Sequence, residues 1–514
     1  MKSLFLNFPI TVFAFIIFPF ILEYGFVAFY ESSELYAIPF FVIKSFVLFL
    51  PFLIFPKHTK KILYLIYAFV YLPLLANICH MLLFGCALSE CSLFSMFETT
   101  IGESIDFLEH FYNFRLLIFI IFYLAAPIFI IKKFLPKSLN FSLKKNQKII
   151  CGFLFIAGYL AFALGDGRYR YPFEKIFGSY LKYRIEVYER KKIRNDRKHF
   201  NYGNIKSVID KNKKQTYVVV IGESVDKKHM SLYGYSRNTT PNFDKIRNEL
   251  YVFQNIRSGF CQTNAVMKCI LLFDQDFKKG DIISFLNEAG FKTFWFSNQH
   301  TSGRYNSTEA MVASQASEFS FINRTYFRVN KTSQYDEALL KCLDYALKDP
   351  SEKKVIFLHL FGSHSVYNKR YPKNFDIFTD PNFTPRANKV AEYDNSIAYT
   401  DYVLMKVLEN LKKSHGEIKI FVYLSDHGED AYDTDESTFS HASGSSPHMF
   451  DIPLIAWFSD EFKKERKNYF ESINLSKKYK TDVMIHSLLD IFGLEHAMIK
   501  KEFSVFRNDN DEKK

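Results

Sequence analysis

Long apolar stretches dominate the first third of the chain. Five of them are long enough to cross a hydrocarbon core of about 30 Å as helices. They occupy residues 5–29, 36–55, 62–86, 114–132 and 148–165. Lysines lie between the second and third stretches and between the fourth and fifth, whereas the loop between the third and fourth is acidic. Because basic loops stay in the cytoplasm, the pattern predicts a five-helix transmembrane domain over 1–165 with its N-terminus inside.

Two ionisable residues, Glu23 and Lys44, fall within the first two stretches. They indicate either a lipid or proton site, or a helix–helix ion pair or snorkelling side chains, and the second interpretation is favoured. A basic and aromatic segment, 168–199, follows the last stretch. Directly after a span, such a segment is expected to lie on anionic headgroups rather than on RNA. We therefore interpret 166–212 as a basic amphipathic linker that lies on the non-cytoplasmic face of the membrane crossed by the helices.

Beyond residue 203 the hydrophobic pattern changes to short apolar runs that alternate with helical stretches, which is typical of an α/β domain. Residues 213–514 are interpreted as this domain, outside the cytoplasm. The predicted buried strands are 216–224, 292–299, 353–364 and 417–430.

Polar side chains collect at the carboxyl ends of these four strands. They are Glu223, Asn298, His364, Asp426 and His427. Ligands of open α/β sheets bind in the crevice beyond the carboxyl ends of the strands. The four segments are therefore expected to bring their polar ends to one rim of the sheet.

Glu223, Asp426 and His427 together form an oxygen, oxygen and nitrogen ligand set. This set suits Zn²⁺ and is acceptable to Mn²⁺. An Asp-His pair alone would more often be a strand end whose aspartate caps the following turn, and Glu223 on a second strand end favours the metal. His359 lies inside an apolar run and is expected to be a core histidine, whereas His448 lies in a loop where a role in the site is plausible.

Composition and charge agree with two unlike halves. Among 514 residues, 58 are Phe and 32 are Tyr, and the formal net charge is +12. The mean hydropathy of −0.07 is too polar for a protein embedded throughout. Because much of the basic excess lies in loops between apolar stretches and in the linker, it orients membrane helices, and no nucleic-acid partner is expected.

A nucleophile is harder to choose from the residues alone. The candidates are Ser224, Thr263, Ser363 and Ser425, each near a predicted strand end or turn. Thr263 stands at a predicted helix start, where free backbone N–H groups can hold a phosphate. Coordination to zinc would lower the pKa of its hydroxyl. The alternative, an N-cap threonine, is equally compatible with the sequence.

Several motifs resemble one family. Residues 221–241, IGESVDKKHMSLYGYSRNTTP, are similar to the block that opens the catalytic domain of bacterial phosphoethanolamine transferases, membrane enzymes of the alkaline phosphatase and sulfatase superfamily. Further similar motifs follow in order: CQTNAVMKC (261–269), FLHLFGSHSVYNKRYP (357–372), YDNSIAYTDYVL (393–404), YLSDHGED (423–430) and the loop ahead of DIPLIAW (451–457). With the five apolar stretches, the resemblance covers nearly the whole chain. The sequence departs from the family pattern in one respect, because it has no arginine shortly after the GES motif.

The resemblance implies an alkaline-phosphatase/sulfatase-like α/β/α catalytic domain in the periplasm of a multi-pass protein of the bacterial inner membrane. It implies that Glu223, Asp426 and His427 bind zinc, and that Thr263 is a fourth ligand and carries phosphoethanolamine. His364 and His441 match positions beside the substrate headgroup or a second zinc. The implied reaction moves phosphoethanolamine from phosphatidylethanolamine to an outer-facing acceptor, lipid A or a core sugar of lipopolysaccharide, and a monomer is expected.

Two features remain open at this point. Cys261 and Cys269 flank Thr263 and are equally compatible with a disulfide in an oxidising compartment and with two buried thiols. The alternative functions are a lipoteichoic-acid-type phosphoglycerol transferase and a catalytically silent membrane anchor that binds a lipid headgroup. The SLYGYSRNTTP block argues against the first and the intact ligand set against the second.

Overall fold

The computed structural model describes most of the chain. The described residues are 8–30, 38–84, 87–99, 104–105, 107–108, 113–135, 138, 143–164, 172–196, 201–299, 307–323, 334–379, 384–434 and 446–507. They belong to two compact units, a membrane unit of residues 1–97 and 111–184 and a catalytic unit of residues 98–110 and 185–514.

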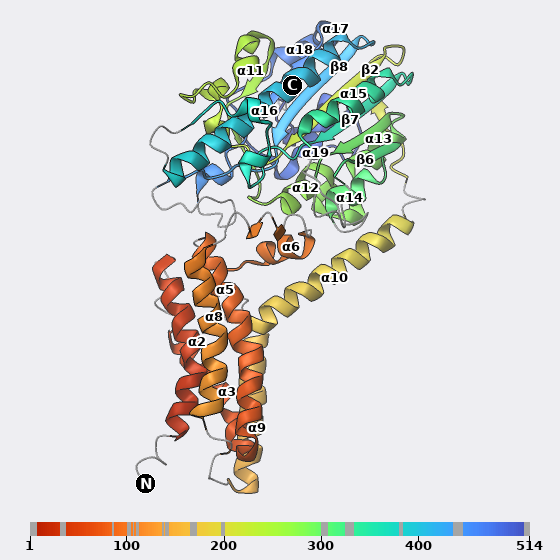
Figure 1. The fold of residues 1–514 in the computed structure, drawn as a ribbon. Coiled ribbons are helices and arrows are strands. Elements are labelled where there is room, and N and C mark those ends of the chain that lie inside the picture. The colour runs from red at the N-terminus through yellow and green to blue at the C-terminus, as the bar shows by residue number, and fades with distance from the viewer. Residues whose placement is uncertain are drawn as a thin grey trace. The chain divides into compact units, whose positions relative to one another are not determined.

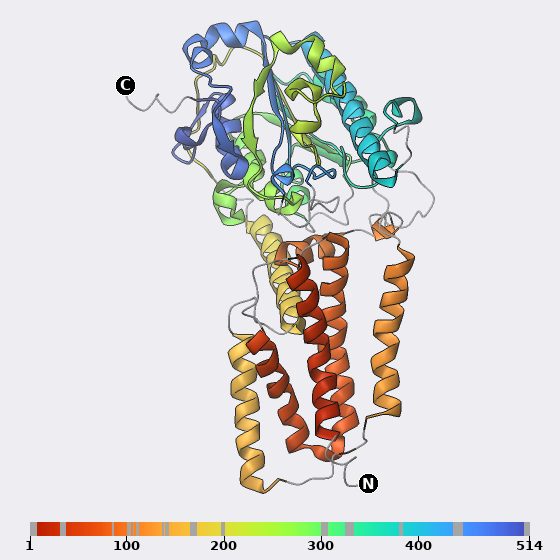
Figure 2. The ribbon, with the colours of Figure 1, turned by 90° about the vertical axis from the view of Figure 1, so that its left-hand side faces the viewer.

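The membrane unit consists of helices that run alongside one another (Figure 2). They are α2 (Phe8–Tyr30), α3 (Ile38–Ile54), a continuous run of η2 (Pro56–His58), α4 (Thr59–Ile66), the π-helical η3 (Tyr67–Tyr71) and α5 (Leu72–Phe84), then α8 (Phe114–Lys133) and α9 (Lys145–Ala163). The short α6 (Glu90–Glu98) follows α5, and α10 (Pro172–Asp196) begins in this unit and continues into the other. Each of the five predicted apolar stretches thus contains a helix.

Three of these helices are long and apolar enough to cross a membrane, by length and composition: Pro56–Phe84, Phe114–Lys133 and Lys145–Ala163. The apolar parts of α2 and α3, Ile10–Phe26 and Pro39–Ile54, are shorter. Across helices, Asn77 Nδ2 donates to Glu23 Oε1 at 2.7 Å. The Lys44 ammonium is buried among aromatic rings and lies 5.6 Å from the centroids of Phe41 and Phe162. Lys44 therefore lies in the interior of the helix bundle and does not snorkel to its surface, whereas Glu23 is partly exposed and is hydrogen-bonded across helices.

The catalytic unit is built on a seven-stranded sheet with the order β3-β9-β8-β2-β7-β5-β6. The strands are β2 (Gln215–Gly222), β3 (Tyr251–Phe253), β5 (Lys292–Ser297), β6 (Glu318–Phe321), β7 (Lys353–His359), β8 (Ile418–Ser425) and β9 (Leu454–Phe458). Strands β8, β2, β7, β5 and β6 are parallel, whereas β9 pairs antiparallel with both β8 and β3. Two small sheets pair β1 (Lys206–Ser207) with β11 (Leu494–Glu495) and β4 (Asn255–Arg257) with β10 (Lys478–Lys480).

Helices cover both faces of the sheet, as its alternating apolar side chains require (Figure 1). Tyr217, Val219 and Ile221 of β2 face a core shared with α12 (Thr263–Leu271), α13 (Ile282–Glu288), α14 (Thr308–Ala313) and α19 (Met484–Ile491). Val218 and Val220 face the opposite core, with α15 (Leu339–Lys348) and α16 (Pro385–Lys413). Among the described residues, the catalytic unit also contains the short helices α11 (Pro241–Lys245), α17 (Asp460–Glu465) and α18 (Lys467–Glu471). The predicted order of apolar helices followed by an α/β/α domain is confirmed.

All four predicted strands are present and lie next to one another in the sheet. Their carboxyl ends are in register, because Ile221 of β2 pairs with Leu424 of β8 and with His359 of β7, and His359 pairs with Ser297 of β5. The last residues of each predicted strand instead form loops. This difference has a physical reason: polar side chains beyond the paired register leave the ladder and turn toward one another.

Candidate active site

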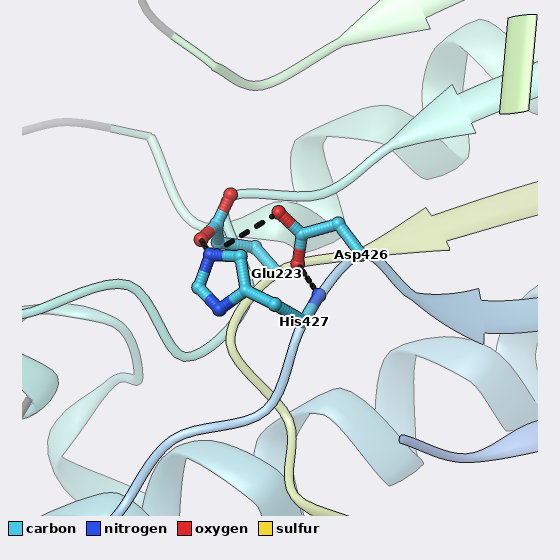
Figure 3. A group of neighbouring side chains, drawn as sticks. All are labelled: Glu223, Asp426 and His427. Atoms are coloured by element: carbon cyan, nitrogen blue, oxygen red, sulfur yellow. Dashed lines mark hydrogen bonds and ion pairs between the residues drawn. The ribbon is translucent and has the colours of Figure 1, made fainter. Parts of the chain in front are cut away.

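The site lies where β2 and β8 end. Glu223 follows β2, and Asp426 and His427 follow β8, its neighbour in the sheet. The Asp426 N–H donates to the Gly222 carbonyl at 3.1 Å, which holds the two strand ends together. Figure 3 shows the three side chains converging on one point. We call Glu223, Asp426 and His427 the Glu223 cluster.

The Glu223 carboxylate is buried and accepts hydrogen bonds on both oxygens. Ser224 Oγ donates to Oε1 at 2.7 Å, and Gln299 Nε2 donates to Oε2 at 3.0 Å. Burial alone would raise the pKa of Glu223, but the nearby His427 lowers it well below its usual value. The carboxylate is therefore ionised, as a metal ligand must be.

The ring of His427 has a fixed orientation. Its Nδ1–H donates to the Gly428 carbonyl at 2.8 Å, which leaves Nε2 to face the two carboxylates. Nε2 lies 3.3 Å from Glu223 Oε1 and 3.4 Å from Asp426 Oδ2. Burial opposes a charge on this ring, but Asp426 and Glu223 raise the pKa of His427 to about 10. The two carboxylates thus favour a positive charge at the position between them.

The hydrogen bonds of Asp426 leave one of its carboxylate oxygens without a donor. Its Oδ1 accepts from the backbone N–H groups of Ser224 and His427, at 3.1 and 2.7 Å. Its Oδ2 is buried and has no hydrogen-bond partner among the described residues. Burial and the neighbouring Glu223 raise the pKa of Asp426 to about 6. A buried carboxylate oxygen without a donor is costly unless a cation is present.

The three residues can supply one ligand atom each, and these atoms lie within 4.8 Å of one another. The donor set, two carboxylate oxygens and one imidazole nitrogen, leaves a coordination position open for a fourth ligand. The residues of the Glu223 cluster therefore fit a bound divalent metal ion.

Thr263 is the first residue of α12. Its hydroxyl lies 3.3 Å from Glu223 Oε2 and 3.3 Å from His427 Nε2. The N-cap position is held by Gln262, whose side chain makes no capping hydrogen bond, so Thr263 is not an N-cap residue. The first N–H groups of a helix lack partners within the helix and carry its positive dipole end. The Thr263 hydroxyl thus faces both the ligand set and a position suited to an anion.

The other hydroxyl candidates are engaged elsewhere. Ser224 adopts a left-handed backbone conformation with φ 58°, and its buried hydroxyl donates to Glu223. Ser363 is fully buried and pairs with Ser396, and Ser425 donates to the His427 carbonyl. Of the four hydroxyls, only that of Thr263 is partly exposed beside the ligand set.

The histidines are distributed unequally. His364 lies in the loop after β7, and its ring stacks on Phe361 with centroids 5.3 Å apart. That loop is fastened to the site, because the Ser363 N–H donates to the Glu223 carbonyl at 2.9 Å. His441 lies outside the described residues. His359 is 1% exposed in β7, and burial lowers its pKa to about 4, as expected for a core histidine.

His448 belongs to a second group, Asp226, Asp433 and His448, which we call the Asp226 cluster. Its ligand-type atoms also lie within 4.8 Å of one another. Here His448 Nδ1 already hydrogen-bonds Asp226 Oδ2 at 2.6 Å, and this bond raises the pKa of His448. His229 Nε2 lies 3.1 Å from Asp433. Hydrogen bonds between histidines and carboxylates hold this cluster together, and we interpret it as an ion-pair network.

Two findings were not apparent in the sequence. Gln299 contacts Glu223, whereas its neighbour Asn298, the residue singled out by the strand pattern, donates to Asp336 Oδ1 at 2.8 Å. Adjacent residues leave a strand on opposite sides, and the sequence does not say which side meets the site. Cys261 and Cys269 are not joined by a disulfide, and Cys269 packs within α12.

Comparison with known proteins agrees with this geometry. Residues 215–494 match the sulfatase family. The phosphoethanolamine transferase EptC of Escherichia coli is 28% identical over 485 residues, covering 87% of this chain and 82% of the relative. The crystal structure of the C-terminal periplasmic domain of EptC from Escherichia coli, in complex with Zn, has a TM-score of 0.55 and 30% identity, and covers 60% of this chain and 90% of that one.

A membrane-embedded structure shares the full architecture. The integral membrane protein lipooligosaccharide phosphoethanolamine transferase A of Neisseria meningitidis has a TM-score of 0.67 at 19% identity, and covers 96% of this chain and 98% of that one. This likeness shows the fold. The chain therefore belongs to the sulfatase family, and its predicted resemblance to the phosphoethanolamine transferases is confirmed.

Proposed function

We propose that this protein is a metal-dependent transferase that moves phosphoethanolamine from phosphatidylethanolamine to lipid A or a core sugar of lipopolysaccharide. The observation that carries the proposal is the Thr263 hydroxyl, 3.3 Å from both Glu223 and His427 at the start of a helix. The similarity to phosphoethanolamine transferases supports the choice of the transferred group.

The proposed metal is Zn²⁺, held by Glu223, Asp426, His427 and Thr263, and Mn²⁺ is also acceptable to this donor set. The unpartnered Asp426 Oδ2 and the zinc complex of the related EptC domain support it. When bound, the ion supplies positive charge that lowers the pKa of the threonine hydroxyl and stabilises charge on the phosphoryl oxygens.

In the first proposed step Thr263 Oγ1 attacks the phosphorus of the donor lipid. The new Oγ1–P bond forms as the P–O bond to diacylglycerol breaks, and diacylglycerol leaves as an alcohol with the proton that the threonine hydroxyl loses. The N–H groups at the start of α12 stabilise the negative charge that develops on the phosphoryl oxygens.

In the second proposed step a hydroxyl of the acceptor attacks the same phosphorus. The acceptor oxygen forms the new ester bond, the Thr263 Oγ1–P bond breaks, and the threonine regains a proton. His364, in the loop fastened to Glu223, is proposed to contact the substrate headgroup, and His441 is proposed for the same role from its sequence position. Such a two-step route gives ping-pong kinetics.

We propose that the protein is a multi-pass, monomeric protein of the bacterial inner membrane. Its proposed division is a transmembrane domain over 1–165, a surface linker over 166–212 and a periplasmic catalytic domain over 213–514. The basic loops between the apolar helices, such as the lysines at the end of α8, support this orientation. A reporter fused after residue 205 should be periplasmic, and one fused near residue 140 cytoplasmic.

The function is tested on the full chain in detergent with phosphatidylethanolamine and no acceptor. Intact-protein mass should rise by one phosphoethanolamine, peptide mapping should locate it on Thr263, and diacylglycerol should appear in equal amount. Absence of an adduct and of diacylglycerol in the zinc-loaded protein would contradict the proposal and favour a silent lipid-binding anchor. Mass spectrometry of lipopolysaccharide from cells with and without the gene then identifies the acceptor.

A further inference from the structure

The amide of Gln299 lies behind the Glu223 cluster, at the end of β5. Gln299 is 9% exposed, and its backbone N–H donates to Ser297 Oγ at 3.1 Å. The start of the side chain is therefore fixed. From the end of β5 the side chain reaches across the end of β7, which lies between β5 and β2 in the sheet, to the end of β2.

The amide nitrogen makes two hydrogen bonds. Gln299 Nε2 donates to the Leu360 carbonyl at 2.9 Å and to Glu223 Oε2 at 3.0 Å. Because both partners, a carbonyl oxygen and a carboxylate oxygen, can only accept hydrogen bonds, the amide nitrogen rather than the amide oxygen must face them. Both N–H bonds of the amide are therefore used. Leu360 is itself anchored, because its N–H donates to the Ile221 carbonyl at 2.9 Å. The position of the amide is thus set by the sheet.

This amide completes the support of Glu223. Ser224 Oγ donates to one carboxylate oxygen and Gln299 to the other. The Thr263 hydroxyl also lies 3.3 Å from Oε2, but the two shorter hydrogen bonds, from Ser224 and Gln299 to opposite oxygens, are those that fix the rotation of the carboxylate plane. Both donors are neutral, so they hold the carboxylate without cancelling the negative charge that attracts a cation.

We propose that Gln299 is a positioning residue that presets Glu223 for metal binding, an inference that rests on the proposed function. It sets the affinity for zinc and the geometry of turnover, and it does not contact the lipid. The neighbouring amide cannot replace it, because Asn298 Nδ2 is committed to Gln334 O and Asp336 Oδ1, both at 2.8 Å.

The test is Gln299→Met in the full-length protein in detergent micelles. Methionine has a similar length and no N–H donor. Zinc affinity, measured by competition with a chromophoric chelator, should fall by about 10- to 100-fold. At saturating zinc, kcat for diacylglycerol release from phosphatidylethanolamine should fall while KM changes less than about twofold.

The matched control is Gln254→Met. Gln254 Nε2 also donates to a backbone carbonyl, that of Val252 at 3.0 Å, but has no bond to the Glu223 cluster. This variant should keep the zinc affinity and kcat of the wild type. If Gln299→Met fails to fold, Gln299→Asn makes the same test, because the shorter amide cannot reach both Leu360 and Glu223.

Thermal unfolding with and without Zn²⁺ separates positioning from general stabilisation. A positioning role predicts that the zinc-induced rise in Tm shrinks in Gln299→Met but not in Gln254→Met. Equal zinc affinity in wild type and Gln299→Met would overturn the inference and leave the proposed function intact. A wild-type protein that binds no zinc would overturn the proposed function itself.

Discussion

Two clusters of the catalytic unit contain the same donor types, two carboxylates and one imidazole, yet they differ in how those donors are used. In the Glu223 cluster, the His427 Nδ1–H is taken by a backbone carbonyl, and Asp426 Oδ2 has no hydrogen-bond partner among the described residues. In the Asp226 cluster, His448 Nδ1 points directly at Asp226 Oδ2 at 2.6 Å. The composition of the two clusters therefore does not distinguish them, whereas the orientation of the histidine does.

The surroundings of the two clusters sharpen this difference. Beside the Asp226 cluster, His229 bridges Asp394 at 2.7 Å and Asp433 at 3.1 Å, and Arg237 bonds the other oxygen of Asp394 at 2.7 Å. The carboxylates there accept hydrogen bonds from His229, His448 and Arg237. Around Glu223 the donors from Ser224 and Gln299 are neutral, and Asp426 Oδ2 has no hydrogen-bond partner among the described residues.

The largest expected effect comes from Thr263, the proposed nucleophile, whose hydroxyl lies beside the Glu223 cluster. Thr263→Ala removes the covalent route, so turnover should fall by about 10⁴-fold or more while affinity for phosphatidylethanolamine is retained. The measurement is diacylglycerol release together with intact-protein mass. Thr263→Ser keeps a hydroxyl and should retain partial activity. An adduct of normal yield on the alanine variant, mapped for example to Ser224, would show that another hydroxyl is the nucleophile.

The next largest effect is expected when one carboxylate of each cluster is replaced by an amide and the two variants are compared. Asp426→Asn should weaken zinc binding by about a thousandfold and remove activity, because a charged ligand is lost. Asp433→Asn should change zinc affinity less than about threefold. Both are measured by metal analysis and chelator competition on the full chain. The metal-free Asp426→Asn protein should be at least as stable as the metal-free wild type, since the amide relieves repulsion from Glu223. Equal zinc loss in both variants would contradict the distinction.

A smaller effect tests the structural role of the ion-pair network. Asp394 is buried and accepts from His229, Arg237 and the Tyr235 hydroxyl. Asp394→Asn leaves two cations poorly compensated, and the free energy of unfolding should fall by about 3 kcal/mol. Denaturant titration of the detergent-solubilised protein measures this. Asp460→Asn, at an exposed ion pair, is the control and should change the free energy of unfolding much less.

The smallest effect is a pH dependence. Burial alone would lower the pKa of His229, but hydrogen bonds to Asp394 and Asp433 raise it to about 10. Because the folded pKa lies above the unfolded value of about 6.5, the stabilisation is complete below pH 6.5 and is lost as the pH rises toward 10. Stability should therefore fall as the pH rises through this window. His229→Gln should flatten the slope in thermal unfolding between pH 7 and 10, and an unchanged slope would contradict the assignment.

The sequence predicted the sheet better than the site. Strands β2, β5, β7 and β8 are short apolar runs that are hydrophobic on both faces, so their existence and parallel arrangement follow from local pattern. Glu223, Asp426 and His427 were found because they directly follow such runs. Gln299 was not found, because its role depends on which way the chain turns after β5. The Asp226 cluster was not found either, since it joins residues 222 positions apart, Asp226 and His448, through loops that carry no periodic signal.

Gly428 shows what the contrast between the clusters means for variation of this chain. Its carbonyl orients His427, its N–H donates to the Met449 carbonyl at 2.9 Å, and a Cβ at this position would overlap the backbone carbonyl oxygen of His448. The backbones of the two clusters are therefore in contact through one residue without a side chain. In a saturation mutagenesis library selected for activity, position 428 should therefore accept no residue other than glycine. Any side chain there would displace His427 of the Glu223 cluster, His448 of the Asp226 cluster, or both.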